Sequence, residues 1–199
     1  MIRIHGSGKS RAFRCLWAAG ESGLPFEHVD TPATRSAAFL RLNPSGKVPA
    51  MEDGELILFE SLAINLHIAR KAGAPLWPAG DDASRALQWT LWAATEIEPH
   101  VLAWGSNTYL RQPAERDLGA AAAAVANLLP RLDVLDGALS GRPFLLGEAF
   151  SIADCNLAGV MYAAWKHGFD LSAHGRSKGW LDRCLSRPAA EAARRLREG

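Results

Sequence analysis

The sequence predicts an α+β domain with the element order βαβαββα, followed by an all-helical domain. Three observations support this prediction. Strand-like and helix-like periodicities alternate through the first part of the chain. Strand signals then nearly vanish, and a segment rich in proline and glycine separates the two parts. We therefore place the first domain at residues 1–75, a linker at 76–82 and the helical domain at 83–199.

The chain opens with a predicted strand, turn, helix and second strand. Residues 1–5 alternate apolar and polar side chains, which favours a strand, and residues 6–9 form a turn. Over residues 10–22 the apolar side chains recur at helical spacing, and Gly23 is a suitable stop. Residues 26–29 favour a second strand. A β-α-β start of this kind predicts a right-handed parallel crossover.

A second helix and a hairpin complete the first domain. The pattern predicts a helix over 33–42, strands at 49–51 and 56–59, and a final helix over 62–72. The Asp-Gly pair between the two strands is a strong hairpin signal. The result is a small mixed sheet with helices on both faces, and the glycines lack the GxGxxG arrangement of dinucleotide folds.

The rest of the chain predicts about five helices. They cover 84–109, 114–139, 151–165, 176–186 and 188–198. Pro99 is expected to kink or divide the first of them and Pro130 to interrupt the second, because proline removes a helical donor.

Composition narrows the class of protein. The formal net charge is +1, which gives no basic excess for a nucleic-acid partner. No secretory signal or membrane-length apolar run is evident. Cys15, Cys155 and Cys184 are too far apart for a metal site and odd in number, so we expect no metal and a reducing, cytoplasmic compartment.

The segment from Asn43 to Pro49 is the first candidate binding element. Val48 is extended because a proline follows it. Pro49 is an unusual start for a strand unless the strand lies at an edge or the Val48–Pro49 bond is cis. A cis bond would present the backbone of Val48 to an extended peptide. An ordinary turn is the simpler alternative for this segment alone.

Two further candidates lie at predicted helix N-termini. Glu60 and Ser61 precede the helix at 62–72, where an acid and a hydroxyl suit the two charges of an α-amino acid headgroup. Ser7 and Ser10 precede the first helix, where a hydroxyl and the helix dipole would stabilise a ligand thiolate. Helix capping is the simpler explanation for Glu60 and Ser61 taken alone, and for Ser7 and Ser10 the sequence does not separate capping from ligand binding.

In combination these segments resemble the thioredoxin-like N-terminal domain of cytosolic glutathione transferases. The stretch SRAFRCLWAAGESGLPFEHV is similar to that family's SRxxRxLWxxxExGLPYE sequence, and NPSGKVP and FESLAI follow in the family's order. In the second half, GEAFSIAD resembles the family's (F)SxAD segment. The resemblance covers about residues 1–190.

The resemblance implies a role for each residue of the first site. Lys47 would contact the glycine carboxylate of glutathione, and Val48 would pair with the cysteinyl backbone, with Pro49 cis. Glu60 and Ser61 would hold the γ-glutamyl headgroup.

The resemblance also implies how the thiol is activated. Ser10 would face the thiol, as in serine-type enzymes, with Ser7 or backbone donors as alternatives. No cysteine stands in this loop, so deglutathionylating chemistry is not expected, and Cys15 is a core residue.

The second substrate is expected in a cleft between the domains. Its candidate contacts are His100, Trp104, Asn107, Tyr109 and Trp165. Packing is the simpler role for any one of these five. Ser151 and Asp154 form an S-x-x-D capping box that we assign to folding.

The resemblance implies conjugation of the glutathione thiolate to a small hydrophobic electrophile, typical of detoxification, by a homodimer. We expect a cytoplasmic protein with no nucleic-acid or membrane partner. A glutathione-dependent isomerase or peroxidase is the first alternative. A non-catalytic binding or regulatory protein is the second.

Overall fold

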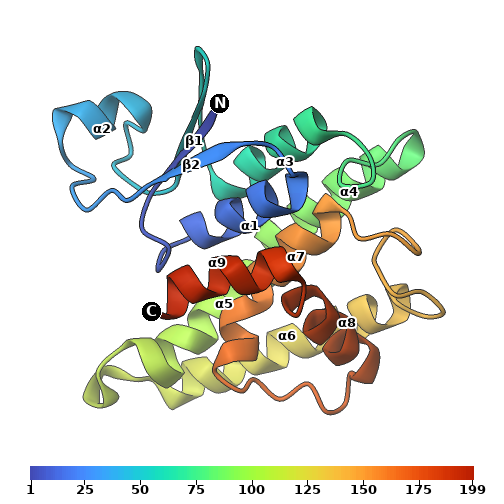
Figure 1. Cartoon of the computed structure of the whole chain (residues 1–199). Coiled ribbons are helices and arrows are strands. Elements are labelled where there is room, and N and C mark those ends of the chain that lie inside the picture. The colour runs from blue at the N-terminus through green and yellow to red at the C-terminus, as the bar shows by residue number, and fades with distance from the viewer. The chain divides into compact units, whose positions relative to one another are not determined.

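The computed structural model describes all residues from 1 to 199, and they form two compact units (Figure 1). The first unit comprises Met1–Ala83 together with Ser186–Gly199, and the second comprises Ser84–Leu185. The predicted α+β domain and the predicted helical domain are both present.

A four-stranded mixed sheet forms the centre of the first unit. Its strands are β1 (Ile2–His5), β2 (Phe26–Val29), β3 (Ala50–Asp53) and β4 (Leu56–Phe59), in the order β2-β1-β3-β4. β1 pairs with β2 in parallel, as the crossover predicts, whereas β3 pairs antiparallel with both β1 and β4. Gly54 at the β3–β4 turn has a φ of 64°, a conformation that favours glycine.

Helices cover this sheet on both sides. α1 (Ala12–Ser22) and α3 (Ser61–Ala72) pack against each other, and α2 (Ala37–Leu42) lies across the strands from them (Figure 1). The largest fully buried side chains of the unit come from the strands and from α1 and α3. They are Ile2, Ile4, Met51, Phe13, Trp17, Ile64 and Ile68.

α9 (Pro188–Glu198) also belongs to the first unit, although the sequence placed residues 83–199 in the helical domain. It packs along α1 (Figure 1). Arg187 donates two hydrogen bonds of 2.7 Å to the carboxylate of Glu21 in α1. The boundary prediction failed here because the periodicity of an amphipathic helix shows which face is buried but not which element covers it.

The second unit consists of helices and short helical turns. They are α4 (Asp81–Trp92), η1 (Ala93–Ile97), α5 (Glu98–Gly105), η2 (Ser106–Leu110), η3 (Pro113–Glu115), α6 (Leu118–Ala138), α7 (Ile152–Lys166) and α8 (Gly175–Leu185). α7 is the most buried of them, and its side chains from Ile152 to Tyr162 all lie in the core.

The two prolines act differently from the prediction. Pro99 lies in the first turn of α5, directly after the π-helical turn η1, so the chain stays helical from Asp81 to Leu110 while the helix type changes. Pro130 lies inside α6 without ending it. Pro130 is exposed. Water can therefore bind the carbonyl group one turn earlier, which has no N–H donor because proline lacks one.

α6 is also long and apolar enough, by length and composition, to cross a membrane. Core helices of soluble proteins satisfy the same criterion, and α6 packs against α5 and α8. This helix is therefore weak evidence for a membrane span.

Candidate functional site

The strand register brings the three predicted segments of the first unit to one end of the sheet. Ala50 pairs with His5 on one side and with Phe59 on the other. One residue further along, Pro49 therefore lies between Gly6 and Glu60. The loop after β1, the turn before β3 and the junction after β4 consequently meet at this end of the sheet.

Gly6 allows the first two segments to approach closely. A Cβ atom on Gly6 would lie 2.9 Å from Cβ of Val48, which is too close for any side chain. Gly6 also has a φ of 137°. Glycine is therefore needed here, and it places the loop that carries Ser7 and Ser10 beside Val48.

Asn43 holds the turn that precedes β3. It is 3 % exposed, its Nδ2 donates to the carbonyl oxygen of Lys47 at 2.6 Å, and its Oδ1 accepts from the N–H of Ser45 at 3.0 Å. Gly46 closes the turn with a φ of 63°. The Lys47 side chain is left exposed on a fixed backbone.

The Val48 backbone is presented without a partner. The Val48–Pro49 peptide bond is cis, and β3 begins only at Ala50. Neither the N–H nor the C=O of Val48 makes a hydrogen bond within the chain. Since backbone groups are strong hydrogen-bonding groups, an extended ligand backbone is a suitable partner for them.

The Glu60–Ser61 pair does not cap α3. Glu60 occupies the N-cap position but its side chain makes no capping bond, and Ser61 is already the first helical residue. Ser61 is 5 % exposed, and its hydroxyl group makes no hydrogen bond within the chain. The capping explanation is therefore wrong for this pair, and both side chains remain available to a ligand.

The backbone of Glu60 is strained. Its φ of 74° makes it the only residue other than glycine with a positive φ. Such a conformation costs on the order of 1–3 kcal/mol and is typical of functional sites. It turns an exposed carboxylate outward at the positive N-terminal end of α3, beside the free N–H groups of its first turn.

Arg35 is a site residue that sequence reasoning missed. Its side chain lies over Gly46, because a Cβ atom on that glycine would be 3.1 Å from the guanidinium carbon. Arg35 and Lys47 are both exposed, and neither has an acidic partner within the chain. Two cations therefore flank this turn. No sequence signal marks Arg35, since its position depends on how the loop before α2 folds back.

In the Ser7–Ser10 loop, the Ser10 hydroxyl makes two hydrogen bonds within the turn that leads into α1, whose N-cap residue is Arg11. The Ser10 hydroxyl donates to the carbonyl oxygen of Ser7 at 2.6 Å and accepts from the N–H of Ala12 at 3.1 Å. The Ser7 hydroxyl accepts from the N–H of Lys9 at 3.3 Å, and its own proton has no acceptor within the chain. Ser7 therefore has a donor to offer in this conformation, whereas Ser10 has already used its own.

None of the three cysteines forms a disulfide. All three cysteines are free and buried, and Cys15 donates its S–H to the carbonyl oxygen of Ser61 at 3.5 Å. Burial raises the pKa of the Cys15 thiol, which disfavours the thiolate. No group of three or more His, Cys, Asp or Glu side chains is arranged to hold a metal ion.

In the second unit, two of the five predicted substrate contacts come together. Trp104 and Tyr109 pack edge to face with ring centroids 5.7 Å apart. Phe169 packs against Trp104 at 5.2 Å, and His167 stacks on Tyr109 at 3.6 Å. The sequence did not single out His167 or Phe169, which come from the end of α7 and the loop after it.

A small residue makes this aromatic cluster possible. A Cβ atom on Gly105 would lie 2.7 Å from the Tyr109 hydroxyl oxygen. The π-helical turn η2 follows directly and carries Tyr109. Such turns are frequent at functional sites because they re-aim side chains.

The other three predicted contacts have separate surroundings. The amide group of Asn107 is bonded at both atoms, donating to Ala103 and accepting from the N–H of Asp117, which is a structural role. Trp165 donates to the carboxylate of Asp182 at 2.8 Å and lines a pocket of about 520 Å³.

His100 lies close to the ion pair of Glu96 and Arg131. Burial and the Arg131 cation lower the pKa of His100, while Glu96 opposes this effect. A neutral imidazole is therefore favoured at this position near neutral pH.

The predicted capping box is present at the start of α7. The Asp154 carboxylate accepts from the N–H and the hydroxyl of Ser151, from the N–H of Leu145 and from Nε1 of Trp180, at 2.8–3.0 Å. Burial raises the pKa of Asp154, and these four bonds counteract the effect. Every contact is internal, as expected for a folding role.

Comparison with known proteins agrees with this arrangement. Residues 4–70 match the N-terminal domain of glutathione S-transferases, and residues 97–188 match the C-terminal domain. Glutathione S-transferase 3 of Zea mays is 34 % identical, over 94 % of this chain and 90 % of that protein. Elongation factor 1-gamma 2 of Oryza sativa subsp. japonica is 32 % identical over 76 % of this chain, which spans only 38 % of that longer protein.

A solved structure shows the same fold. The theta class glutathione S-transferase of the citrus canker pathogen Xanthomonas axonopodis pv. citri, with glutathione bound, is 27 % identical and superimposes with a TM-score of 0.88, covering 96 % of each chain. The two domain matches and the likeness over nearly the whole chain show that this protein belongs to the glutathione S-transferase family.

Proposed function

We propose that the protein binds glutathione at the end of the sheet where Gly6, Pro49 and Glu60 meet, and that it transfers the glutathione thiolate to a small hydrophobic electrophile. The tripeptide lies extended, with its central backbone hydrogen-bonded to Val48. Its glycine carboxylate lies between Lys47 and Arg35, because two unpaired cations suit an anion.

The observation that carries this proposal is the Glu60–Ser61 junction. A γ-glutamyl headgroup has one ammonium and one carboxylate group. The exposed carboxylate of Glu60 suits the ammonium group, while the Ser61 hydroxyl and the N–H groups at the start of α3 suit the carboxylate. A strained residue that caps nothing is difficult to explain as a structural feature alone.

The proposed reaction is a nucleophilic substitution or addition. The thiolate sulfur attacks the electrophilic carbon and forms a C–S bond, and a leaving group departs with its electron pair or the adduct takes up a proton. A free thiol has a pKa of about 8.5, so a decrease of about two units makes the thiolate the main form at neutral pH. The N-terminus of α1 and a loop hydroxyl would supply this stabilisation.

The aromatic cluster is the proposed contact for the electrophile. Trp104 and Tyr109 offer flat apolar surface, and Tyr109 adds a hydroxyl group. A cytoplasmic location and a homodimeric state are part of the same proposal. Both follow from membership of the family rather than from any contact described above.

Two variants are expected to identify the hydroxyl that faces the thiol. Replacing the effective serine by alanine should reduce kcat about 10- to 100-fold, because a hydrogen bond to a charged group contributes about 1.5–3 kcal/mol, while the affinity for glutathione stays within about threefold. Ser10→Ala also removes two hydrogen bonds of the turn before α1, so it should cost about 0.5–2 kcal/mol of stability, more than Ser7→Ala, which loses one long hydrogen bond. Steady-state kinetics and thermal unfolding of both variants measure these effects.

The outcomes separate the candidates. Loss of kcat in Ser7→Ala alone would assign the thiol contact to Ser7, and loss in Ser10→Ala beyond its stability cost would assign it to Ser10. If both variants keep full turnover, backbone donors stabilise the sulfur instead.

Glutathione binding and conjugation are tested together. Millimolar glutathione should raise the Tm, because a ligand that binds only the folded state stabilises it. The protein should then conjugate glutathione to a chloronitrobenzene or an epoxide faster than the uncatalysed rate. A cis-enedione and an organic peroxide serve as parallel substrates, and preferential turnover of either would favour the isomerase or peroxidase alternative.

The likeness to elongation factor 1-gamma supports a second candidate, a non-catalytic binding module. That candidate predicts no turnover with any substrate of the panel. An unchanged Tm with glutathione would further show that the site at the end of the sheet does not bind this ligand, and would overturn the main proposal.

A further inference from the structure

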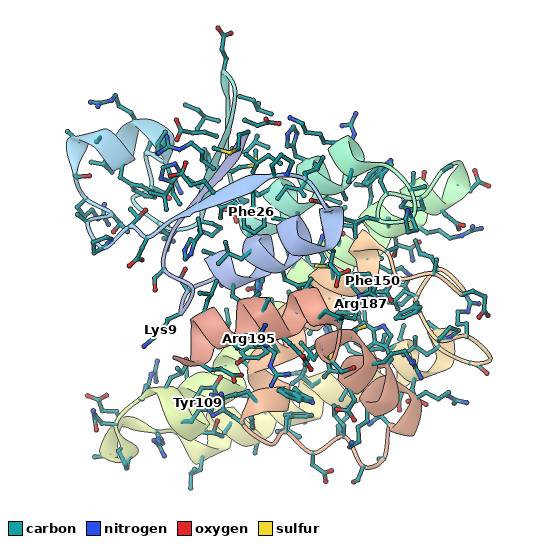
Figure 2. All side chains as sticks on the ribbon, in the orientation of Figure 1. Lys9, Phe26, Tyr109, Phe150, Arg187 and Arg195 are labelled. Atoms are coloured by element: carbon teal, nitrogen blue, oxygen red, sulfur yellow. The ribbon has the colours of Figure 1, made fainter.

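α9 contacts the loop that carries Ser7 and Ser10. The loop precedes α1, and α9 packs along α1 in the same unit. Figure 2 labels Lys9 on this loop and Arg195 on α9. Residues nearly 190 positions apart in the sequence are therefore direct neighbours, and Lys9 Nζ donates to the carbonyl oxygen of Gly199 at 3.2 Å.

Arg197 makes the strongest of these contacts. Its Nη1 donates to the carbonyl oxygen of Ser10 at 2.6 Å, and its guanidinium group lies 5.5 Å from the ring centroid of Phe13 in α1. The cation is thereby held between a ring face and a carbonyl group. A planar guanidinium group suits this double contact better than an ammonium group would.

Gly8 provides a second, independent contact. A Cβ atom on Gly8 would lie 2.7 Å from the carbonyl oxygen of Leu196, which is a backbone atom that cannot rotate away. Gly8 has an ordinary φ, so backbone conformation alone does not require glycine here. The close approach of α9 does require it.

The Ser10 peptide group fixes the geometry of the whole loop. Ser10 bonds the Ser7 carbonyl through both its N–H and its hydroxyl, and its own carbonyl accepts from the N–H of Phe13 and from Arg197. Movement of this carbonyl would carry both candidate hydroxyls and the first turn of α1 with it. These are the groups that would face the ligand sulfur.

We propose that Arg197 is a positioning residue for the thiol site, which it serves by holding the Ser10 carbonyl and thereby the Ser7–Ser10 loop. This inference rests on the proposed function. α9 is then a functional part of the glutathione-binding unit. A displacement of about 1 Å at a reacting group can reduce turnover by up to about a hundredfold, so a single distant hydrogen bond can be kinetically important.

The test compares Arg197→Met with Arg195→Met. Both variants lose one positive charge from the last turn of α9, but the Arg195 side chain is exposed and makes no hydrogen bond or ion pair within the chain. In Arg197→Met we expect kcat to fall about tenfold, the KM for glutathione to stay within about threefold, and the pKa of the bound thiol to rise by about one unit, read from the thiolate absorbance against pH. Arg195→Met should match the wild type in all three.

A second readout does not depend on catalysis. Hydrogen–deuterium exchange over residues 6–12 should accelerate in Arg197→Met and not in Arg195→Met. Gly8→Ala, which also disturbs the contact between the loop and α9, should accelerate the same exchange, and it replaces Arg197→Met if that variant does not fold. Unchanged exchange in Arg197→Met and in Gly8→Ala would overturn the inference. A fall in kcat without a rise in the thiol pKa would overturn it as well. Absence of turnover in the wild type contradicts the proposed function instead, and the exchange experiment still decides the role of Arg197.

Discussion

Replacing Asp154 by alanine is expected to lower the free energy of unfolding by about 3–5 kcal/mol, because the change leaves several buried donors without an acceptor. Asp154 is 0 % exposed and accepts four hydrogen bonds from three separate segments. One comes from Leu145 in the preceding loop, two from Ser151 and one from Trp180 in α8. The carboxylate therefore ties the loop, the start of α7 and α8 together.

The matching control lies in the same segment. The Glu148 side chain is exposed and makes no hydrogen bond or ion pair within the chain, so Glu148→Ala removes an acid at almost no expected cost to stability. Urea denaturation followed by tryptophan fluorescence gives the free energy of unfolding for both variants. If Asp154→Ala lost less than about 1 kcal/mol, the four donors would have to find other partners, and Asp154 would not be a central folding contact.

The hairpin and most helices could be predicted because their signals are local. The Asp-Gly pair before β4 and the glycine after α1 act through their own backbone conformation, and the structure shows both with a positive φ. The apolar spacing predicted α7, and the S-x-x-D sequence predicted its capping box. Both signals could be read because the residues involved are close together in the sequence.

Features that depend on distant contacts could not be predicted. Arg35 lies beside Gly46 only because the loop before α2 folds back. Likewise, α9 belongs to the first unit only because it packs against α1. Neither pairing leaves a pattern in the sequence. The same reason explains why His167 was not singled out, since its stacking on Tyr109 joins two helix ends that are far apart in the chain.

The two helix N-termini show why residue types alone left capping and ligand binding unresolved. Ser10 and Ser61 both precede or begin a helix, and the same hydroxyl serves either role. The structure separates them, because the Ser10 hydroxyl accepts the N–H of Ala12 whereas the Ser61 hydroxyl makes no hydrogen bond within the chain. Binding is therefore better supported at the β4–α3 junction than in the loop before α1.

Replacing Glu60 by alanine is expected to raise the KM for glutathione at least about tenfold, since a hydrogen bond between charged groups contributes about 1.5–3 kcal/mol. The Tm should change little, because the side chain is exposed and bonds nothing within the chain. Isothermal titration and steady-state kinetics measure the loss. Glu55→Ala, which removes another exposed acid from the β3–β4 turn, is the matched control and should bind glutathione normally.

Glu60→Gly separates binding from backbone strain. It should lose glutathione affinity as alanine does, yet it should be about 1 kcal/mol more stable than Glu60→Ala, because glycine adopts a φ of 74° without the steric cost that alanine keeps. A more stable protein that binds glutathione poorly would show that the strained conformation is retained for the ligand. Normal affinity in both variants would mean that the carboxylate does not contact the headgroup, and the γ-glutamyl assignment would fail while the fold remained unaffected.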